Sequence, residues 1–193
     1  SLNAKGSYDT QASFTGATGL HSTSATVAAS SVQAGSVSVS SLDKTEAMNN
    51  AGSLAVGGLG MSAGVALTTL GGANNASISS ASLTTPGSVT VDAGTRELHA
   101  GTTSVQSRAI AGAGGLVGLG AAVSLAKNDT ANSASLSGTV NAGGAVNASA
   151  LDDASMRSES YGASVGAVSV GVVIAKAEQS GSVFTQVGGS ITG

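Results

Sequence analysis

Large aliphatic and small residues alternate along three segments of the chain, 59–67, 117–125 and 168–174. A period of two predicts a strand with two unlike faces. Superposing Leu67, Leu125 and Ile174 brings the aliphatic positions of the three segments into register. We expect the aliphatic residues to lie in the core: Leu59, Met61, Val65, Leu67, Val117, Leu119, Val123, Leu125, Val168, Val172 and Ile174. The opposite face is made of small residues: Gly60, Ser62, Gly64, Ala66, Gly118, Gly120, Ala122, Ser124, Ser169 and Gly171.

The small-residue face offers little hydrophobic driving force but lets a facing layer come nearer than the usual ~10 Å between sheets. Natural proteins usually block such flat surfaces with charge, so an open one is expected to be covered. We therefore expect this face to meet either another sheet of the same molecule or a neighbouring fibre.

A second recurring motif divides the chain into repeats. GSVSV at 35–39 is followed by GSVTV at 87–91, GAVNA at 144–148 and GSIT at 189–192, at spacings of 52, 57 and 45 residues. Each motif predicts a short strand that begins after a glycine turn. A polar stretch with most of the charge follows, and then comes the glycine-rich strand. That strand is expected to end at a charged turn, Lys127/Asp129 or Lys176/Glu178, and to lead to a third strand.

A unit of 45–57 residues that cannot close a core alone is typical of a solenoid. Three strands per unit with small-residue turns favour an all-β fold, a parallel β-helix of about three repeats. We expect one continuous array over residues 1–193, with a degenerate unit at 1–34 and the start of a further repeat at 189–193. The repeats between them are 35–86, 87–143 and 144–188.

Composition agrees with a repetitive β architecture rather than with a compact enzyme. The 193 residues include 29 glycines and one proline, and only 9% are charged and 2% aromatic. The net charge of −3 and the lack of any basic cluster argue against a nucleic-acid partner. There is no cysteine. The chain has no signal peptide at its start and stops inside a repeat, so we expect it to be a segment of a longer chain.

Groups that could carry chemistry are scarce. His21 and His99 are 78 residues apart, and Asp152 and Asp153 point in opposite directions if the chain is extended there. The glycine run at 112–118 lacks the third glycine of a dinucleotide-binding motif, because Val117 occupies that position. Asn75, Asn128 and Asn147 stand in glycosylation sequons, which arise easily in a chain of this composition. The sequence therefore predicts no catalytic, cofactor-binding or metal-binding residues.

A membrane helix is the main alternative for one stretch. Between Arg108 and Lys127 lie 18 uncharged residues, and Gly114/Gly118 have the spacing of a helix-packing motif. A helix here would contain several glycines, each costing up to about 1 kcal/mol relative to alanine. The aliphatic residues also recur every second position, which favours a strand and no membrane span.

The segment GSVTVDAGTRELHAGTTSVQSRAIAGAGGLVGLGAAVSLAKNDTANSASLSGTV at 87–140 resembles the repeats of large bacterial filamentous surface exoproteins. These are the haemagglutinin-like and leukotoxin-like adhesins, and the resemblance covers residues 35–193. It implies a right-handed β-helical fibre at the bacterial cell surface, with a role in adhesion, cell–cell contact or biofilm formation. It also implies self-association into fibres and contact with host or neighbouring cells.

Two other functions are open to a β-helical chain. A β-helical enzyme acting on glycans would need aromatic platforms and a cluster of carboxylates or basic groups, which the sequence does not offer. An ice-binding solenoid would need a regular ladder of threonines, and the threonine pairs here are out of register. The sequence therefore favours a non-enzymatic structural segment.

Overall fold

The computed structural model describes residues 8–97 and 101–192 of the chain. Strand makes up 86% of the structure, and the described residues contain no helix. The strands are β1 (Tyr8–Gln33), β2 (Val37–Lys44), β3 (Ala47–Val56), β4 (Leu59–Thr85), β5 (Val89–Arg96), β6 (Val105–Gly114), β7 (Val117–Ala142), β8 (Val146–Asp153), β9 (Met156–Val165), β10 (Val168–Gln179) and β11 (Ser182–Thr192).

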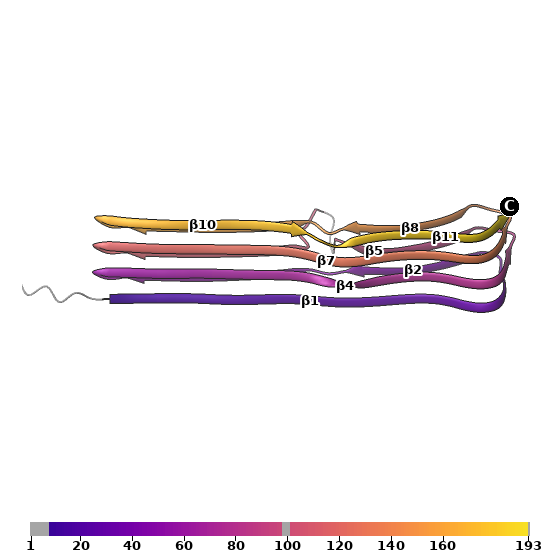
Figure 1. The fold of residues 1–193 in the computed structure, drawn as a ribbon, viewed down its shortest axis with the longest axis horizontal. Coiled ribbons are helices and arrows are strands. Elements are labelled where there is room, and N and C mark those ends of the chain that lie inside the picture. Colours follow the sequence, from indigo (N-terminus) through magenta and orange to yellow (C-terminus); the bar gives the residue numbers. More distant parts are fainter. Residues whose placement is uncertain (1–7, 98–100, 193) are drawn as a thin grey trace, which may run out of the picture.

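One coil of the structure consists of a long strand followed by two shorter strands that return on the other side. Sheet A contains the long strands in the order β1-β4-β7-β10, with β11 continuing the last coil beside β7. Sheet B has the order β2-β5-β8, and sheet C has the order β3-β6-β9. Every neighbouring pair is parallel. Figure 1 shows the coils stacked in order, which confirms the predicted parallel β-solenoid.

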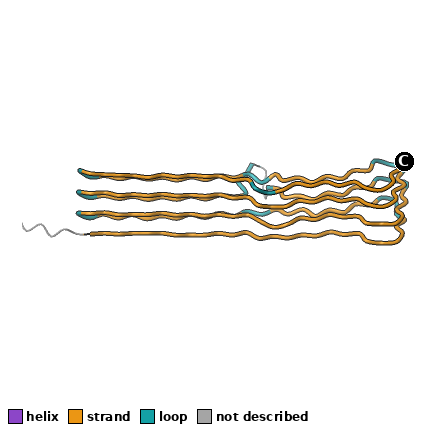
Figure 2. Tube along the Cα trace, in the orientation of Figure 1, coloured by secondary structure: helices purple, strands orange, loops and turns teal. Residues whose placement is uncertain are grey.

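The register between coils gives the repeat length. Tyr8 pairs with Leu59, Leu59 with Val117, and Val117 with Val168. In sheet A, hydrogen-bonded side chains such as Thr23 and Asn74, or Asn74 and Asn132, are accordingly 51 or 58 residues apart in sequence. The longer coil contains a longer connection between β5 and β6. Figure 2 shows that the loops lie at the two ends of the coil and at the place where sheets B and C meet.

Two expected alignments are wrong. Ile174 pairs with Val123 and not with Leu125, although Leu67 does pair with Leu125 as predicted. The GSIT motif at 189–192 pairs with residues 138–141 of β7, so it ends β11 rather than beginning another repeat. A four-residue pattern of Gly, Ser and one aliphatic residue is too short to distinguish two strands of the same coil.

The strands within a coil also differ from the prediction. The charged turn expected at Lys127/Asp129 is absent, because both residues lie inside β7, one strand of 26 residues. Charged residues do not end a strand when their side chains point to solvent. Only in the last coil does the long strand break, between β10 and β11. The polar stretch of each repeat contains a strand that was not predicted: β3, β6 or β9.

Sheet B and the second half of each long strand enclose an apolar core, which we call the thick half. Its largest side chains are fully buried, and each contributes about 1.5–3 kcal/mol relative to the exposed state. The core residues of this half are Val39, Ile78, Leu83, Val89, Val91, Leu136 and Val140, packed with several alanines.

Sheet C and the first half of each long strand form a much thinner layer, which we call the thin half. Its buried apolar cluster is made only of alanines: Ala51, Ala66, Ala109, Ala111 and Ala122. A Cβ placed on Gly60 would lie 2.6 Å from the carbonyl oxygen of Gly114, and one on Gly64 would lie 2.6 Å from that of Ile110. The backbones of the two sheets are therefore in contact, closer than the usual ~10 Å.

Serine side chains join the two layers of the thin half. Ser107 Oγ donates a hydrogen bond of 2.8 Å to the carbonyl oxygen of Ala66 across the core. Ser164 Oγ reaches the carbonyl oxygen of Gly118 at 3.0 Å. A side chain this short can bond the opposite backbone only because the two sheets lie so close together. The small-residue face thus meets another sheet of the same solenoid, the first of the two expected alternatives.

The assignment of the aliphatic face to the core is wrong. Ser124 and Ala66 are fully buried, whereas Met61 and Leu67 are 41% and 44% exposed. Alternation defines two faces but does not say which one is inside. The inner side of sheet C is itself made of alanine and serine, so small residues on both layers pack at short range and leave the aliphatic residues of sheet A outside.

Two leucines of β4 test this arrangement. Leu70 is fully buried against Val105 and Ala126, while Leu67, three residues earlier, is half exposed. We expect Leu70→Ala to lower the free energy of unfolding by about 3 kcal/mol. Leu67→Ala should lower it by less than about 1 kcal/mol. Urea denaturation followed by circular dichroism measures both, and a larger effect for Leu67→Ala would contradict the structure.

Candidate interaction surface

The outer side of sheet A carries most of the aliphatic residues of the thin half. We define the aliphatic face as the outward side chains of residues 59–67 of β4 and of the residues paired with them in β1, β7 and β10. Its exposed members include Phe14 at 72%, Val170 at 53% and Ile174 at 52%. Contiguous apolar patches of this kind are rare on soluble proteins and mark interaction sites.

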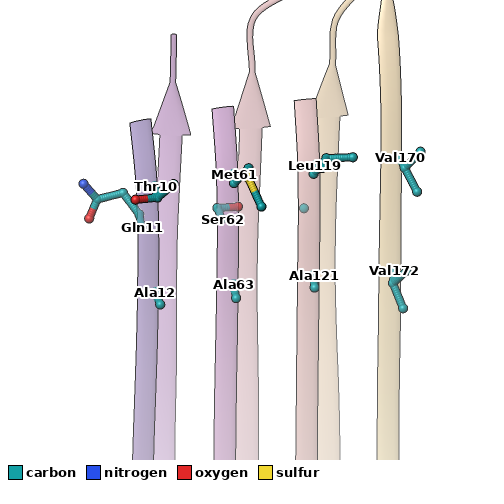
Figure 3. A pocket seen from close by; sticks show the side chains of 11 residues that line it. Thr10, Gln11, Ala12, Met61, Ser62, Ala63, Leu119, Ala121, Val170 and Val172 are labelled. Atoms are coloured by element: carbon teal, nitrogen blue, oxygen red, sulfur yellow. The ribbon is translucent and has the colours of Figure 1, made fainter. Parts of the chain in front are cut away.

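Parallel pairing arranges this face in rows that run across the strands. Met61, Leu119 and Val170 form the first ridge. Ala12, Ala63 and Ala121 form the next row, which is lower because alanine is small. Figure 3 shows these two rows at successive levels across the neighbouring strands, with Val172 closing the alanine row on β10. Phe14, Val65, Val123 and Ile174 form the second ridge beyond the alanine row.

The alanine row is the floor of a groove of about 460 Å³. The residues that line it are Thr10, Gln11, Ala12, Met61, Ser62, Ala63, Leu119, Gly120, Ala121, Val170 and Val172. None of them is charged or aromatic. The groove can therefore take apolar groups, but it offers no acid or base for catalysis.

Charged residues begin at the border of the aliphatic face. Lys127 pairs with Asp129 at 3.2 Å, and Lys176 pairs with Glu178 at 2.6 Å. The hydrogen bond and charge of Lys176 lower the pKa of the Glu178 carboxyl. The border thus carries equal numbers of both signs.

The outer side of sheet C is more polar. Arg157 pairs with Glu159, and this hydrogen bond is the main reason why the pKa of Glu159 is lowered. The Arg108 guanidinium lies 5.1 Å from the centre of the Tyr161 ring. Ile110 and Leu54 are exposed on the same side, at 42% and 67%. Charge in the middle of this side distinguishes it from the aliphatic face.

Polar side chains fill the interior where the thin and thick halves meet. Asn74 is buried and donates to Asn132 Oδ1 at 2.8 Å and to Thr95 Oγ1 at 3.1 Å. Its own Oδ1 accepts a hydrogen bond from Thr23 at 2.7 Å. This ladder was not predicted, although the signal was present: Asn74 and Asn132 occupy the same position of the repeat in ANNASI and ANSASL.

Asp152 belongs to a second interior cluster. It lies at the end of β8 and faces inward, while Asp153 is exposed, as the predicted alternation requires. Asp152 Oδ2 accepts hydrogen bonds from Asn128 at 2.9 Å, Thr130 at 3.1 Å and Gln179 at 2.5 Å. Asp152 therefore lies in a strand and not in a loop, and its carboxylate accepts hydrogen bonds from the buried Asn128 and Thr130.

The two neighbouring aspartates give a matched test. Asp152→Ala removes the acceptor shared by Asn128, Thr130 and Gln179, of which Asn128 keeps a hydrogen bond to Gln179 Oε1, and should lower the free energy of unfolding by about 1–2 kcal/mol. Asp153→Ala removes only an exposed carboxylate and should change it by less than about 0.5 kcal/mol. The two midpoints of chemical denaturation can be compared directly, and equal midpoints would show that the cluster does not contribute.

The other candidates from the sequence are dispersed. His21 is exposed on β1, and His99 lies outside the described residues. Residues 112–118 contain the end of β6, a turn at 115–116 and the start of β7, rather than the strand–turn–helix unit that binds a pyrophosphate. Of the three sequon asparagines, Asn128 is fully buried, while Asn75 and Asn147 are exposed.

Within the described residues there is no group of three or more His, Cys, Asp or Glu side chains that could hold a metal ion. The same part of the chain contains no helix with the length and apolarity needed to cross a membrane. The segment between Arg108 and Lys127 forms parts of β6 and β7, so its interpretation as strand is confirmed. No protein-family model, no curated protein and no solved structure matches this chain.

Proposed function

We propose that the chain is a non-enzymatic structural segment of an extracellular bacterial fibre or adhesin. The observation that carries the proposal is the continuous pairing of whole coils: β4 pairs with β1 and β7 along nearly its entire length, with one register shift at Ser80/Ser82. Each added coil repeats the same ladder, so the fold extends along its axis without a new core.

The mechanism of such a segment is mechanical. The solenoid axis runs along the interstrand hydrogen bonds, and each coil is held to the next by one long and two short ladders. A load along the axis is shared by many parallel hydrogen bonds, which makes the segment stiff. The low content of Lys and Arg, seven in 193 residues, also leaves few sites for trypsin-like proteases. Both properties suit a stalk that supports a binding region away from the cell.

The extracellular location is supported by the resemblance of residues 87–140 to filamentous surface exoproteins. The partners we propose are further copies of the chain, and host or neighbouring cell surfaces. An enzymatic role on glycans is less favoured, because the groove on the aliphatic face has no carboxylate and no aromatic platform.

Electron microscopy of the purified chain tests the structural part of the proposal. Strands of 26 or 27 residues predict particles with one dimension of about 85 Å, set by the rise of ~3.3 Å per residue. Duplicating residues 59–167 adds two coils, and we expect growth of about 10 Å along the solenoid axis with an unchanged width. Two separate particles joined by a linker would contradict an extensible stalk.

The proposed role in attachment is tested with bacterial cells. Bacteria that display the chain on their surface should attach to abiotic or cellular surfaces more than bacteria that display an unrelated β-solenoid of similar length. The purified chain should release no reducing ends from a panel of polysaccharides. Turnover that disappears when Asp152 or Asp129 is replaced would overturn the non-enzymatic role.

A further inference from the structure

We propose that the aliphatic face binds a second copy of this chain, so that two solenoids pair side by side with parallel axes. The inference concerns a surface and its partner, and it does not depend on the role of the chain in a fibre. It rests on the shape of the face, its area and the charges at its border.

The relief of the face allows it to pack against a second copy of itself. The first ridge (Met61, Leu119, Val170) and the second ridge (Phe14, Val65, Val123, Ile174) are separated by the alanine groove. A twofold axis parallel to the solenoid axis, placed between the groove and the second ridge, sets the second ridge of each copy over the groove of the other. The same axis sets the row of Leu67 and Leu125 against the first ridge of the partner, as in the packing of two apolar sheets. An isologous contact of this kind uses the same patch on both subunits.

This symmetry keeps the coils level with one another. Rotation about the solenoid axis reverses the strand direction but not the order of the coils, so β7 of one copy faces β7 of its partner. The strands of sheet A run straight and level in the thin half (Figure 1), which allows two such faces to meet over their whole width. Dry interdigitation of side chains between flat sheets is a stable arrangement.

The area is sufficient for a specific contact. Nine residues along each of four strands cover about 600 Å² of flat surface, from a rise of ~3.3 Å per residue and a strand spacing of ~4.8 Å. The ridges raise the accessible area above the flat value. A standard interface buries about 800 Å² per partner, so the face is of the right size for a pair.

The border favours a protein partner over a lipid surface. Membrane-binding faces carry an excess of Lys and Arg around their apolar residues. Here Lys127 is paired with Asp129 and Lys176 with Glu178, so the border is neutral overall. An apolar centre with a mixed charged border is the usual anatomy of a protein interface.

Sedimentation velocity of the 193-residue chain, from low micromolar to near-millimolar concentration, tests the pairing. We expect a concentration-dependent dimer. Val65→Lys combined with Val123→Lys puts charges on both sides of the contact and should raise the dissociation constant at least about tenfold. The matched control, Leu54→Lys combined with Ile110→Lys on the outer side of sheet C, should leave it unchanged. Circular dichroism checks that all variants fold.

Variants that fill the groove distinguish specific dimerisation from non-specific hydrophobic association. Ala63→Leu with Ala121→Leu makes the face more apolar but removes the space for the partner's ridge. We expect dimerisation to weaken at least about tenfold, whereas binding to lipid or non-specific aggregation would become stronger. The register can be read from single-cysteine variants, because the chain has no cysteine of its own. A short bis-maleimide should join Ala121→Cys to Val123→Cys more efficiently than it joins either variant to itself.

Several results would overturn the proposal: a monomer at all concentrations, a dimer that survives the Val65/Val123 variant, or one that the sheet C control disrupts equally. Stronger association after the groove is filled would also overturn it. Binding of the monomer to vesicles of phosphatidylcholine and phosphatidylglycerol, with no dimer in solution, would assign the face to a membrane instead.

Discussion

Replacing Ser124 with aspartate should unfold the thin half of the solenoid, whereas replacing the adjacent Val123 with aspartate should leave it folded. Ser124 is fully buried between sheets A and C, and its hydroxyl bonds to Ser107 and Ser158. Aspartate at this position buries an unpaired carboxylate in a layer too thin to admit water. The cost should be at least about 4 kcal/mol, the range reserved for buried uncompensated charge.

Val123 points outward from the same strand. Aspartate there remains hydrated and loses only cross-strand contacts with Val65 and Ile174 and some strand propensity, which together cost about 1 kcal/mol. Urea denaturation of both variants measures the difference. Ser124→Ala serves as the control that removes the hydroxyl without adding charge. If Val123→Asp proved the more damaging of the two, the assignment of inner and outer faces would be reversed.

The inner and outer faces of β7 follow from the sequence once the strand is taken to continue through Lys127 and Asp129. Lys127 and Asp129 share the odd-numbered side of β7 with Val117, Val123 and Leu125. A strand that continues through them must turn that side to solvent, because a lysine and an aspartate are rarely buried. Interpreting the pair as a turn removed this information, and the more apolar side was then assigned to the core.

Strand β6 carries the same kind of signal. Arg108 must face outward, which places Ser107, Ala109 and Ala111 inside. The outward position of this one arginine therefore implies that the inner surface of sheet C consists of small residues. Its sequence was assigned to a polar stretch because it lacks large aliphatic residues at period two. The solenoid class, by contrast, follows from recurrence alone and does not require knowing which side is inside.

The sequence does not predict the backbone conformation where the long strands bend. The register shift between Ser80 and Ser82 depends on how the long strand bends at the end of the coil. Gly138 and Gly189 occupy the same bend in later coils with φ values of 114° and 101°. Ser80 takes the equivalent position in β4, where the register shift replaces the positive φ of the glycines. The same bend is therefore formed by two different backbone conformations. A single sequence does not reveal that such positions are equivalent.

Glycines of the thin half should respond to alanine in the order of their distance from the opposite backbone. An added Cβ would lie 2.6 Å from a carbonyl oxygen at Gly60 and Gly64, 3.1 Å at Gly118 and 3.5 Å at Gly120, and would meet nothing within 4 Å at Gly171. These residues belong to extended strands, so conformational strain is not the variable. Gly171 lies on the exposed last strand β10 and serves as the control, whereas the other four substitutions change the separation of the layers.

We expect Gly60→Ala and Gly64→Ala to lower the free energy of unfolding by about 2–3 kcal/mol each, since carbonyl groups must move to make room. Gly118→Ala should cost less, and Gly120→Ala should be close to neutral. Gly171→Ala should stabilise by about 0.5 kcal/mol, because alanine restricts the unfolded chain and meets no obstacle in the folded one. Leucine at Gly64 should prevent the thin half from closing at all. Urea midpoints across the five variants give the order, and a uniform loss, or a uniform gain, would mean that backbone contact between sheets A and C does not set the spacing of the layers.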